Sequence, residues 1–158
     1  MLPVFQTVLA GFIATAAMSG ALYAIHWRGL AEADMIRAIG SIVTRKEENA
    51  MLPGLILHFL SGIVFAFLYV IVWSALPIED FVFVAYVALG LFTGFAHGLV
   101  VSFVLVVLVA EHHPVPRFQQ AGVEVAVAHL AAHVIFGLLV GLVAGSLRVS
   151  LAVLPSLI

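Results

Sequence analysis

The sequence predicts an all-α, four-helix transmembrane bundle with an amphipathic interfacial segment between its first and second helices. The chain of 158 residues is 65% hydrophobic and only 9% charged, whereas a soluble domain has about 25% charged residues. Crossing the hydrocarbon core as a helix takes roughly 20 apolar residues. Four stretches meet this length, at about residues 2–25, 51–76, 81–110 and 122–147. We therefore expect residues 1–158 to form a single integral membrane domain, with no room for a sizeable extramembrane module.

The first stretch is expected to be a retained span rather than a cleaved signal. Residues 14–16 (ATA) are similar to a cleavage site, but no Lys or Arg precedes the stretch. Its apolar run is also longer than the hydrophobic region of a secretory signal.

The long polar segment at residues 27–50 separates the first two spans. Its apolar residues recur at helical spacing: Leu30, Met35, Ile36, Ile39 and Ile42 or Val43. This pattern predicts an amphipathic helix lying on the membrane. The second connection, at residues 75–80, is expected to be a tight turn, and two prolines interrupt the third, at residues 111–120.

Positive charge is concentrated in the first and third connections. They contain Arg28, Arg37, Arg45, Lys46 and Arg117, and the opposite side has only Arg148. Because cytoplasmic loops carry an excess of Lys and Arg, both longer connections are expected in the cytoplasm and both termini outside.

Each span carries small residues at four-residue spacing. These stripes are Gly11, Thr15 and Ser19; Gly62 and Ala66; Gly90, Gly94 and Gly98; and Gly137, Gly141 and Gly145. Helix backbones approach closely in lipid where such residues meet. The stripes predict a compact bundle, and homo-oligomerisation or docking onto a larger membrane complex is the competing use of the same stripes, which can coexist with it.

Four histidines, His58, His97, His129 and His133, lie within the apolar runs. An ionisable side chain inside a membrane is costly and indicates a functional site. Their spacing to the glycines places them on the packing faces, because residues four apart share a helix face. At 1.5 Å per residue they lie roughly 10–21 Å below the same edge of the membrane. A buried, histidine-lined site in one half of the bilayer is therefore expected.

Several chemistries fit this site. Neutral imidazoles are ligands for Zn, Cu or Fe, and two facing histidines among His58, His97 and His133 suit the axial positions of a haem b. The full candidate metal set comprises these residues and their polar surroundings: His58, His97, His129, His133, Glu111, His112, His113 and Glu124. Histidines also relay protons near neutral pH.

The functional hypothesis is a transition-metal or haem-binding membrane protein, as an accessory subunit of a redox complex. One alternative is a structural or assembly subunit without cofactor, in which the histidines are interhelical hydrogen-bonding groups. Another is a conduit for protons or metal ions. The pair His112 and His113 also fits a solvated loop.

Other features bound the function. No Ser/His/Asp constellation, nucleophile elbow or phosphate-binding loop is present in the sequence, so no catalytic residue is assigned. A net charge of −2 argues against a nucleic-acid partner, and the expected partner is the lipid bilayer. Trp27 and Trp73, at the ends of two spans, are interpreted as interfacial anchors.

Three segments resemble a known family. They are residues 11–18 (GFIATAAM), 58–69 (HFLSGIVFAFLY) and 133–145 (HVIFGLLVGLVAG). They are similar to small, uncharacterised bacterial inner-membrane proteins of the YagU-like kind, in which His58 and His133 match the pattern. The resemblance implies a multi-pass protein of the bacterial inner membrane and carries no established activity.

Overall fold

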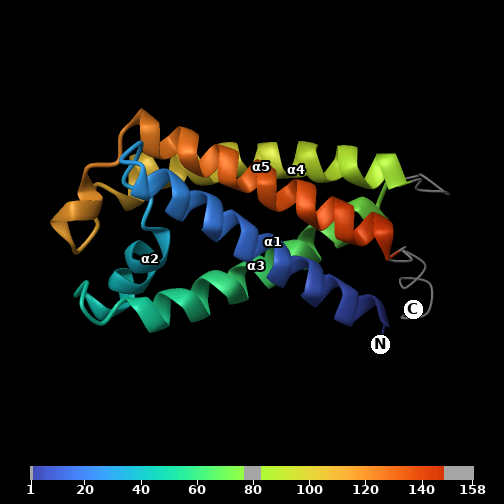
Figure 1. Cartoon of the computed structure of the whole chain (residues 1–158), viewed down its shortest axis with the longest axis horizontal. Helices are drawn as coiled ribbons and strands as arrows, with labels where there is room; N and C mark the ends of the chain where they lie inside the picture. The colour runs from blue at the N-terminus through green and yellow to red at the C-terminus, as the bar shows by residue number, and fades with distance from the viewer. Residues whose placement is uncertain (1, 77–82, 148–158) are drawn as a thin grey trace.

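The computed structural model describes residues 2–76 and 83–147, and every regular element within them is helical (Figure 1). Five α-helices follow in chain order: α1 (Leu2–Trp27), α2 (Met35–Thr44), α3 (Met51–Ser74), α4 (Phe83–Val104) and α5 (Val123–Ser146). A π-helical turn, η1 (Leu105–Val109), extends α4, and a short 3-10 helix, η2 (Pro116–Gln119), lies in the third connection. The predicted fold class is confirmed. Most of the predicted turn at residues 75–80 lies outside the described residues.

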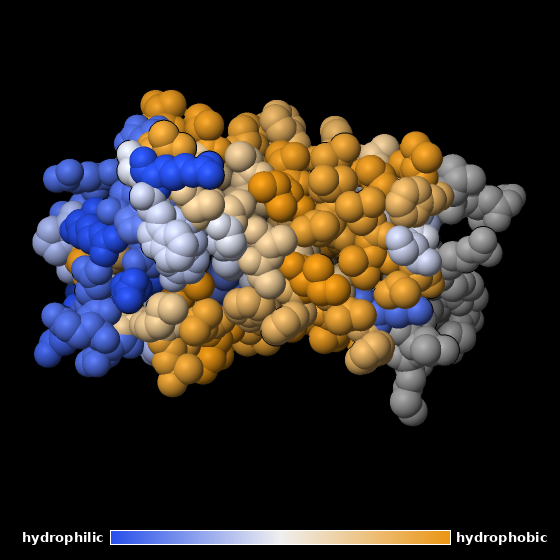
Figure 2. Space-filling model, viewed as in Figure 1, coloured by the Kyte–Doolittle hydropathy of each residue, from blue (hydrophilic) through white to orange (hydrophobic). Residues whose placement is uncertain are grey.

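Four of these helices are long and apolar enough to cross a membrane. They are α1, α3, α4 with its η1 extension, and α5. Large hydrophobic side chains such as Phe12, Leu60 and Phe92 point outward from them. Figure 2 shows hydrophobic residues over most of the visible length of these helices. This arrangement indicates a multi-pass membrane protein.

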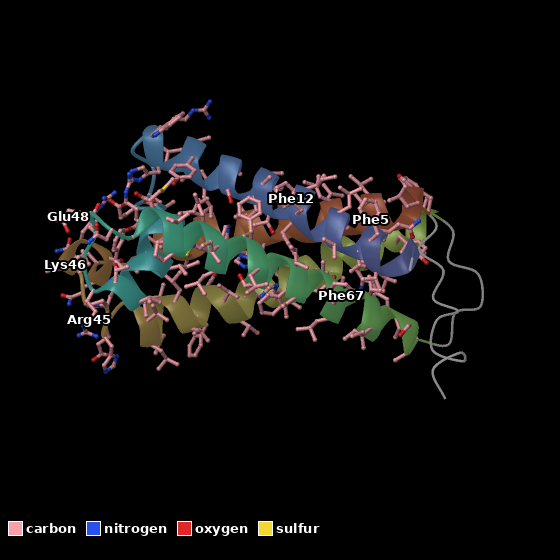
Figure 3. All side chains as sticks on the ribbon, turned by 90° about the horizontal axis from the view of Figure 1, so that it is seen from below. Phe5, Phe12, Arg45, Lys46, Glu48 and Phe67 are labelled. Carbon is pink, nitrogen blue, oxygen red and sulfur yellow. The ribbon has the colours of Figure 1, made fainter. Side chains whose placement is uncertain are left out.

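Hydrophilic residues gather at one end of the molecule (Figure 2). Arg45, Lys46 and Glu48 project from this end, between α2 and α3 (Figure 3). Arg117 of the third connection hydrogen-bonds Glu32 of the first at 2.9 Å. The two longer connections therefore share one end of the bundle, as the charge pattern predicts.

Helices α4 and α5 pack with their backbones in direct contact along the glycine stripes. A Cβ atom at Gly94 would lie 2.5 Å from the carbonyl oxygen of His133 and 3.0 Å from Cα of Gly137. Gly90 faces Gly137 and Gly141 in the same way. No side chain fits between the helices at these positions, so the stripes fix how α4 sits on α5.

A second pair of small-residue contacts joins α3 to its neighbours. Gly11 of α1 would place a Cβ atom 2.8 Å from Cα of Ile63, beside Gly62. At the polar end, Gly40 of α2 lies against the backbone of Ala50 and Gly54 at the start of α3. This second contact was not predicted from the sequence, because Gly40 lies outside the four spans.

The helices succeed one another in space as α3, α1, α5 and α4, and the backbones of α3 and α4 come close at few positions. In Figure 1, α3 diverges from α4 and α5 toward the polar end. The amphipathic helix α2 lies in the wide end of this wedge and buries Ile36, Gly40 and Ser41. Asp34 caps α2 by accepting a hydrogen bond from the backbone N–H of Arg37 at 3.3 Å.

Replacing Gly94 with Ala tests the close α4–α5 contact. The added methyl group meets the His133 carbonyl and must push the helices apart, and such overpacking costs about 1–3 kcal/mol. We expect Gly94→Ala to lower the unfolding free energy of the purified protein by that amount. Gly20→Ala is the control, because its Cβ has no other atom within 4 Å. Equal stability of the two variants would show that α4 and α5 do not touch at this position.

Candidate functional site

A cavity of about 150 Å³ lies among the five α-helices. His58, His97, His129 and His133 all line it, together with apolar side chains that include Met18, Phe65 and Phe136. Three of the histidines are buried, and His97 is half-buried. The cavity therefore brings together the four histidines that the sequence places in one half of the membrane.

His129 and His133 direct the same ring nitrogen toward a helix carbonyl. Nδ1 of His129 lies 2.7 Å from the carbonyl oxygen of Val125, and Nδ1 of His133 lies 2.7 Å from that of His129. Because a carbonyl only accepts, Nδ1 carries the proton in both neutral rings and Nε2 keeps a free lone pair. Nε2 of His129 is buried and has no hydrogen-bond partner among the described residues.

His97 joins this pair from α4. Its ring centroid lies 4.7 Å from that of His133, and its Nδ1 lies 3.0 Å from the Tyr69 hydroxyl. That hydroxyl donates to the carbonyl of Thr93 at 3.3 Å, so it accepts from Nδ1–H of His97. Nε2 of His97 is then an acceptor that, like Nε2 of His129, is buried and has no partner among the described residues.

His58 is bonded differently. Its Nε2 lies 3.0 Å from Oγ of Ser19, and that hydroxyl donates to the carbonyl of Thr15 at 2.8 Å. Nε2–H of His58 is therefore the donor to Ser19, which ties α3 to α1. For this histidine the interhelical hydrogen-bonding interpretation fits the contacts.

The remaining candidate ligands are not brought to the cavity. Glu111, His112 and Glu124 are exposed. His113 is buried, which corrects its interpretation as part of a solvated loop, and its Nε2–H donates to the carbonyl of Ala38 in α2 at 3.0 Å. Within residues 2–76 and 83–147 there is no group of three or more His, Asp or Glu side chains able to hold a metal ion.

A charged network closes the polar end above the cavity. Arg117 hydrogen-bonds Glu32 at 2.9 Å, lies 3.7 Å from the buried carboxylate of Asp34 and also pairs with Glu47. The bond to Glu32 raises the pKa of Arg117 above its usual value. A smaller cavity of about 60 Å³ lies beneath this network.

The small cavity and the histidine cavity share three lining residues. These are His129, Met35 and Ile39. Side chains of α2 and α5 thus stand between the polar end and the histidines.

Sequence reasoning missed the aromatic part of the site. Trp73 was interpreted as an interfacial anchor, but it is fully buried and packs on Tyr69 and Tyr86, with ring centroids 5.9 and 6.1 Å away. The Tyr69 hydroxyl hydrogen-bonds the imidazole of His97, and the Phe65 ring packs on the same imidazole with the two ring centroids 4.1 Å apart. The four-residue spacing of Phe65, Tyr69 and Trp73 on one face of α3 was the available signal.

The sequence model of one family, described as a family of unknown function (DUF6789), matches residues 1–151. The chain belongs to the DUF6789 family. No curated protein and no solved structure matches it. Membership of DUF6789, a family of unknown function, is consistent with the resemblance to an uncharacterised family.

Two histidine variants of this DUF6789 protein separate the roles of His58 and His129. His58→Leu removes a buried hydrogen bond and should lower the unfolding free energy by about 1 kcal/mol. His129→Leu removes a buried acceptor without a partner, a group that costs roughly 1–3 kcal/mol, so stability should stay unchanged or rise. Chemical unfolding of the purified variants measures both effects. A larger loss for His129→Leu than for His58→Leu would assign His129 a purely structural role.

Proposed function

We propose that this protein is an integral membrane binding protein whose cavity receives a small ligand at unprotonated imidazole nitrogens. The observation that carries the proposal is the buried Nε2 of His129, which lines the cavity and has no partner among the described residues. An unsatisfied buried acceptor costs roughly 1–3 kcal/mol. A bound ligand that donates to it, or coordinates through it, removes that cost.

A transition metal ion is the second candidate, and one observation favours it. Metal-bound histidines usually donate their other ring N–H to a carbonyl or carboxylate, which is the arrangement of His129 and His133. Haem b fits less well, because a cavity of about 150 Å³ holds roughly one benzene ring. A bound transition metal ion or haem b would suit an accessory subunit of a membrane redox complex.

Analysis of what co-purifies with the protein tests the proposal. Wild-type protein, isolated from native membranes without chelators, should carry a small molecule or a metal ion at near-equimolar amount. His129→Leu combined with His133→Leu should lose it, because both free Nε2 atoms are removed. Organic extraction with mass spectrometry, elemental analysis and an absorption spectrum measure the content. His112→Ala, an exposed histidine, is the control, and equal ligand content in all three proteins would contradict the proposal.

We also propose that the polar end faces the cytoplasm of a bacterial inner membrane, in agreement with the excess of Lys and Arg there. The chain has no cysteine, so single introduced cysteines report orientation. Asn49 is exposed at the polar end, and Ala75 is exposed just after the opposite end of α3, so Asn49→Cys and Ala75→Cys report the two sides. A membrane-impermeant maleimide should label Ala75→Cys in intact cells and Asn49→Cys only in inverted vesicles. The reverse pattern would place the polar end outside.

A further inference from the structure

The wall of the histidine cavity selects for a neutral hydrogen-bond donor. Its lining contains no carboxylate, Lys or Arg side chain. Nε2 of His129 and of His133 only accept, because Nδ1 of each ring already donates to a carbonyl. Burying an uncompensated charge beside apolar side chains is costly. A neutral molecule with an O–H or N–H group meets these constraints better than a bare cation.

The size and the apolar part of the wall select for a single aromatic ring. A dry cavity of about 150 Å³ takes up a molecule of the size of benzene, and this cavity has that volume. Met18, Phe65 and Phe136 form part of its surface. Thioether and ring groups of this kind make favourable contacts with an aromatic ring.

The cavity rim lies between α3 and α4, beside α2. Lining residues of α1 and α5 such as Leu22 and His129 are buried, whereas the half-buried lining residues include Phe65, His97 and Val101 of α3 and α4, and Met35 and Ile39 of α2. Helices α3 and α4 are membrane spans whose backbones come close at few positions, and side chains such as Tyr69 and His97 bridge the space between them. The Phe65 ring packs on His97 across this space, with ring centroids 4.1 Å apart. For a ligand dissolved in the bilayer, this rim offers a sideways route to the cavity, past the Phe65 ring.

We propose that the cavity binds the hydroxylated aromatic ring of a membrane-soluble phenol, whose O–H donates to Nε2 of His129 or His133 and whose alkyl tail stays between α3 and α4. This assignment rests on the proposed binding function and names its ligand class. It uses the three unusual properties of the site together: buried acceptors, a ring-sized volume and a rim inside the membrane.

A matched pair of ligands tests the hydrogen bond without any mutation. Wild-type protein in lipid nanodiscs is titrated with para-hexylphenol and with para-hexylanisole, its methyl ether, and the heat of partitioning into empty nanodiscs is subtracted. The ether keeps the ring and the tail but has no donor. We expect it to bind about tenfold more weakly, the effect of one lost hydrogen bond at a buried acceptor. Equal affinity for the two compounds would overturn the assignment.

Variants locate the contact. One of His129→Leu and His133→Leu should weaken binding of the phenol about tenfold and leave binding of the ether unchanged, because only the donor–acceptor contact is lost. The variant that does so identifies the acceptor, and His112→Ala should bind both ligands as wild type does. Equal affinity of every variant for the phenol would show that it binds elsewhere, and would overturn the assignment.

A titration with Zn²⁺ or Cu²⁺ alone separates this inference from the proposed function. Metal binding that depends on His129 and His133, without binding of the phenol, would keep the binding function and overturn the phenol assignment. If neither the phenol nor the metal binds, the phenol assignment and the metal candidate are both wrong, and the co-purification experiment decides the binding function.

Discussion

The close backbone contact between α4 and α5 is the constraint on which the rest of the structure depends. Gly94 faces the carbonyl of His133, and Gly90 faces Gly137, so no side chain separates the two helices. This contact sets His97 beside His133, with ring centroids 4.7 Å apart. Since α5 also packs on α1, and α1 on α3, the helix order keeps the backbones of α3 and α4 apart, with side chains between them. The wedge between them holds both α2 and the histidine cavity, so the site follows from how α4 and α5 pack.

The choice of ring nitrogen decides what each histidine does. Polar groups in a membrane must be satisfied inside the protein. In α5 the carbonyl four residues earlier accepts a hydrogen bond from Nδ1–H of His129, which leaves Nε2 as an acceptor facing the cavity. In α3 the proton of His58 is instead on Nε2 and is donated across to Ser19. The same residue type thus joins two helices in one place and presents a free lone pair in another.

How much the sequence predicts depends on the range of the interaction. Spans and small-residue stripes follow from local hydrophobicity and from the four-residue helical period, and the placement of His129 and His133 beside Gly137 follows from the same period. Depth along a helix, however, does not fix lateral position. Glu111 and Glu124 share a membrane half with the histidines but lie on the surface. Burial of Trp73 and His113, and the contact of Gly40 with Gly54, depend on which helices become neighbours, and local hydrophobicity and helical periodicity do not reveal that pairing.

Helix α2 connects the cavity to the chemistry of the polar end. It has only ten residues, and isolated helices shorter than about 12–15 residues are marginal in water, so its structure depends on docking. The docking contacts are Gly40 against α3, the Ala38 carbonyl against His113, and Asp34 beside Arg117. Met35 and Ile39 of the same helix form part of the cavity wall. One short helix thus carries both the buried Asp34 carboxylate beside Arg117 and two side chains of the cavity wall, so the charged end and the cavity share a structural element.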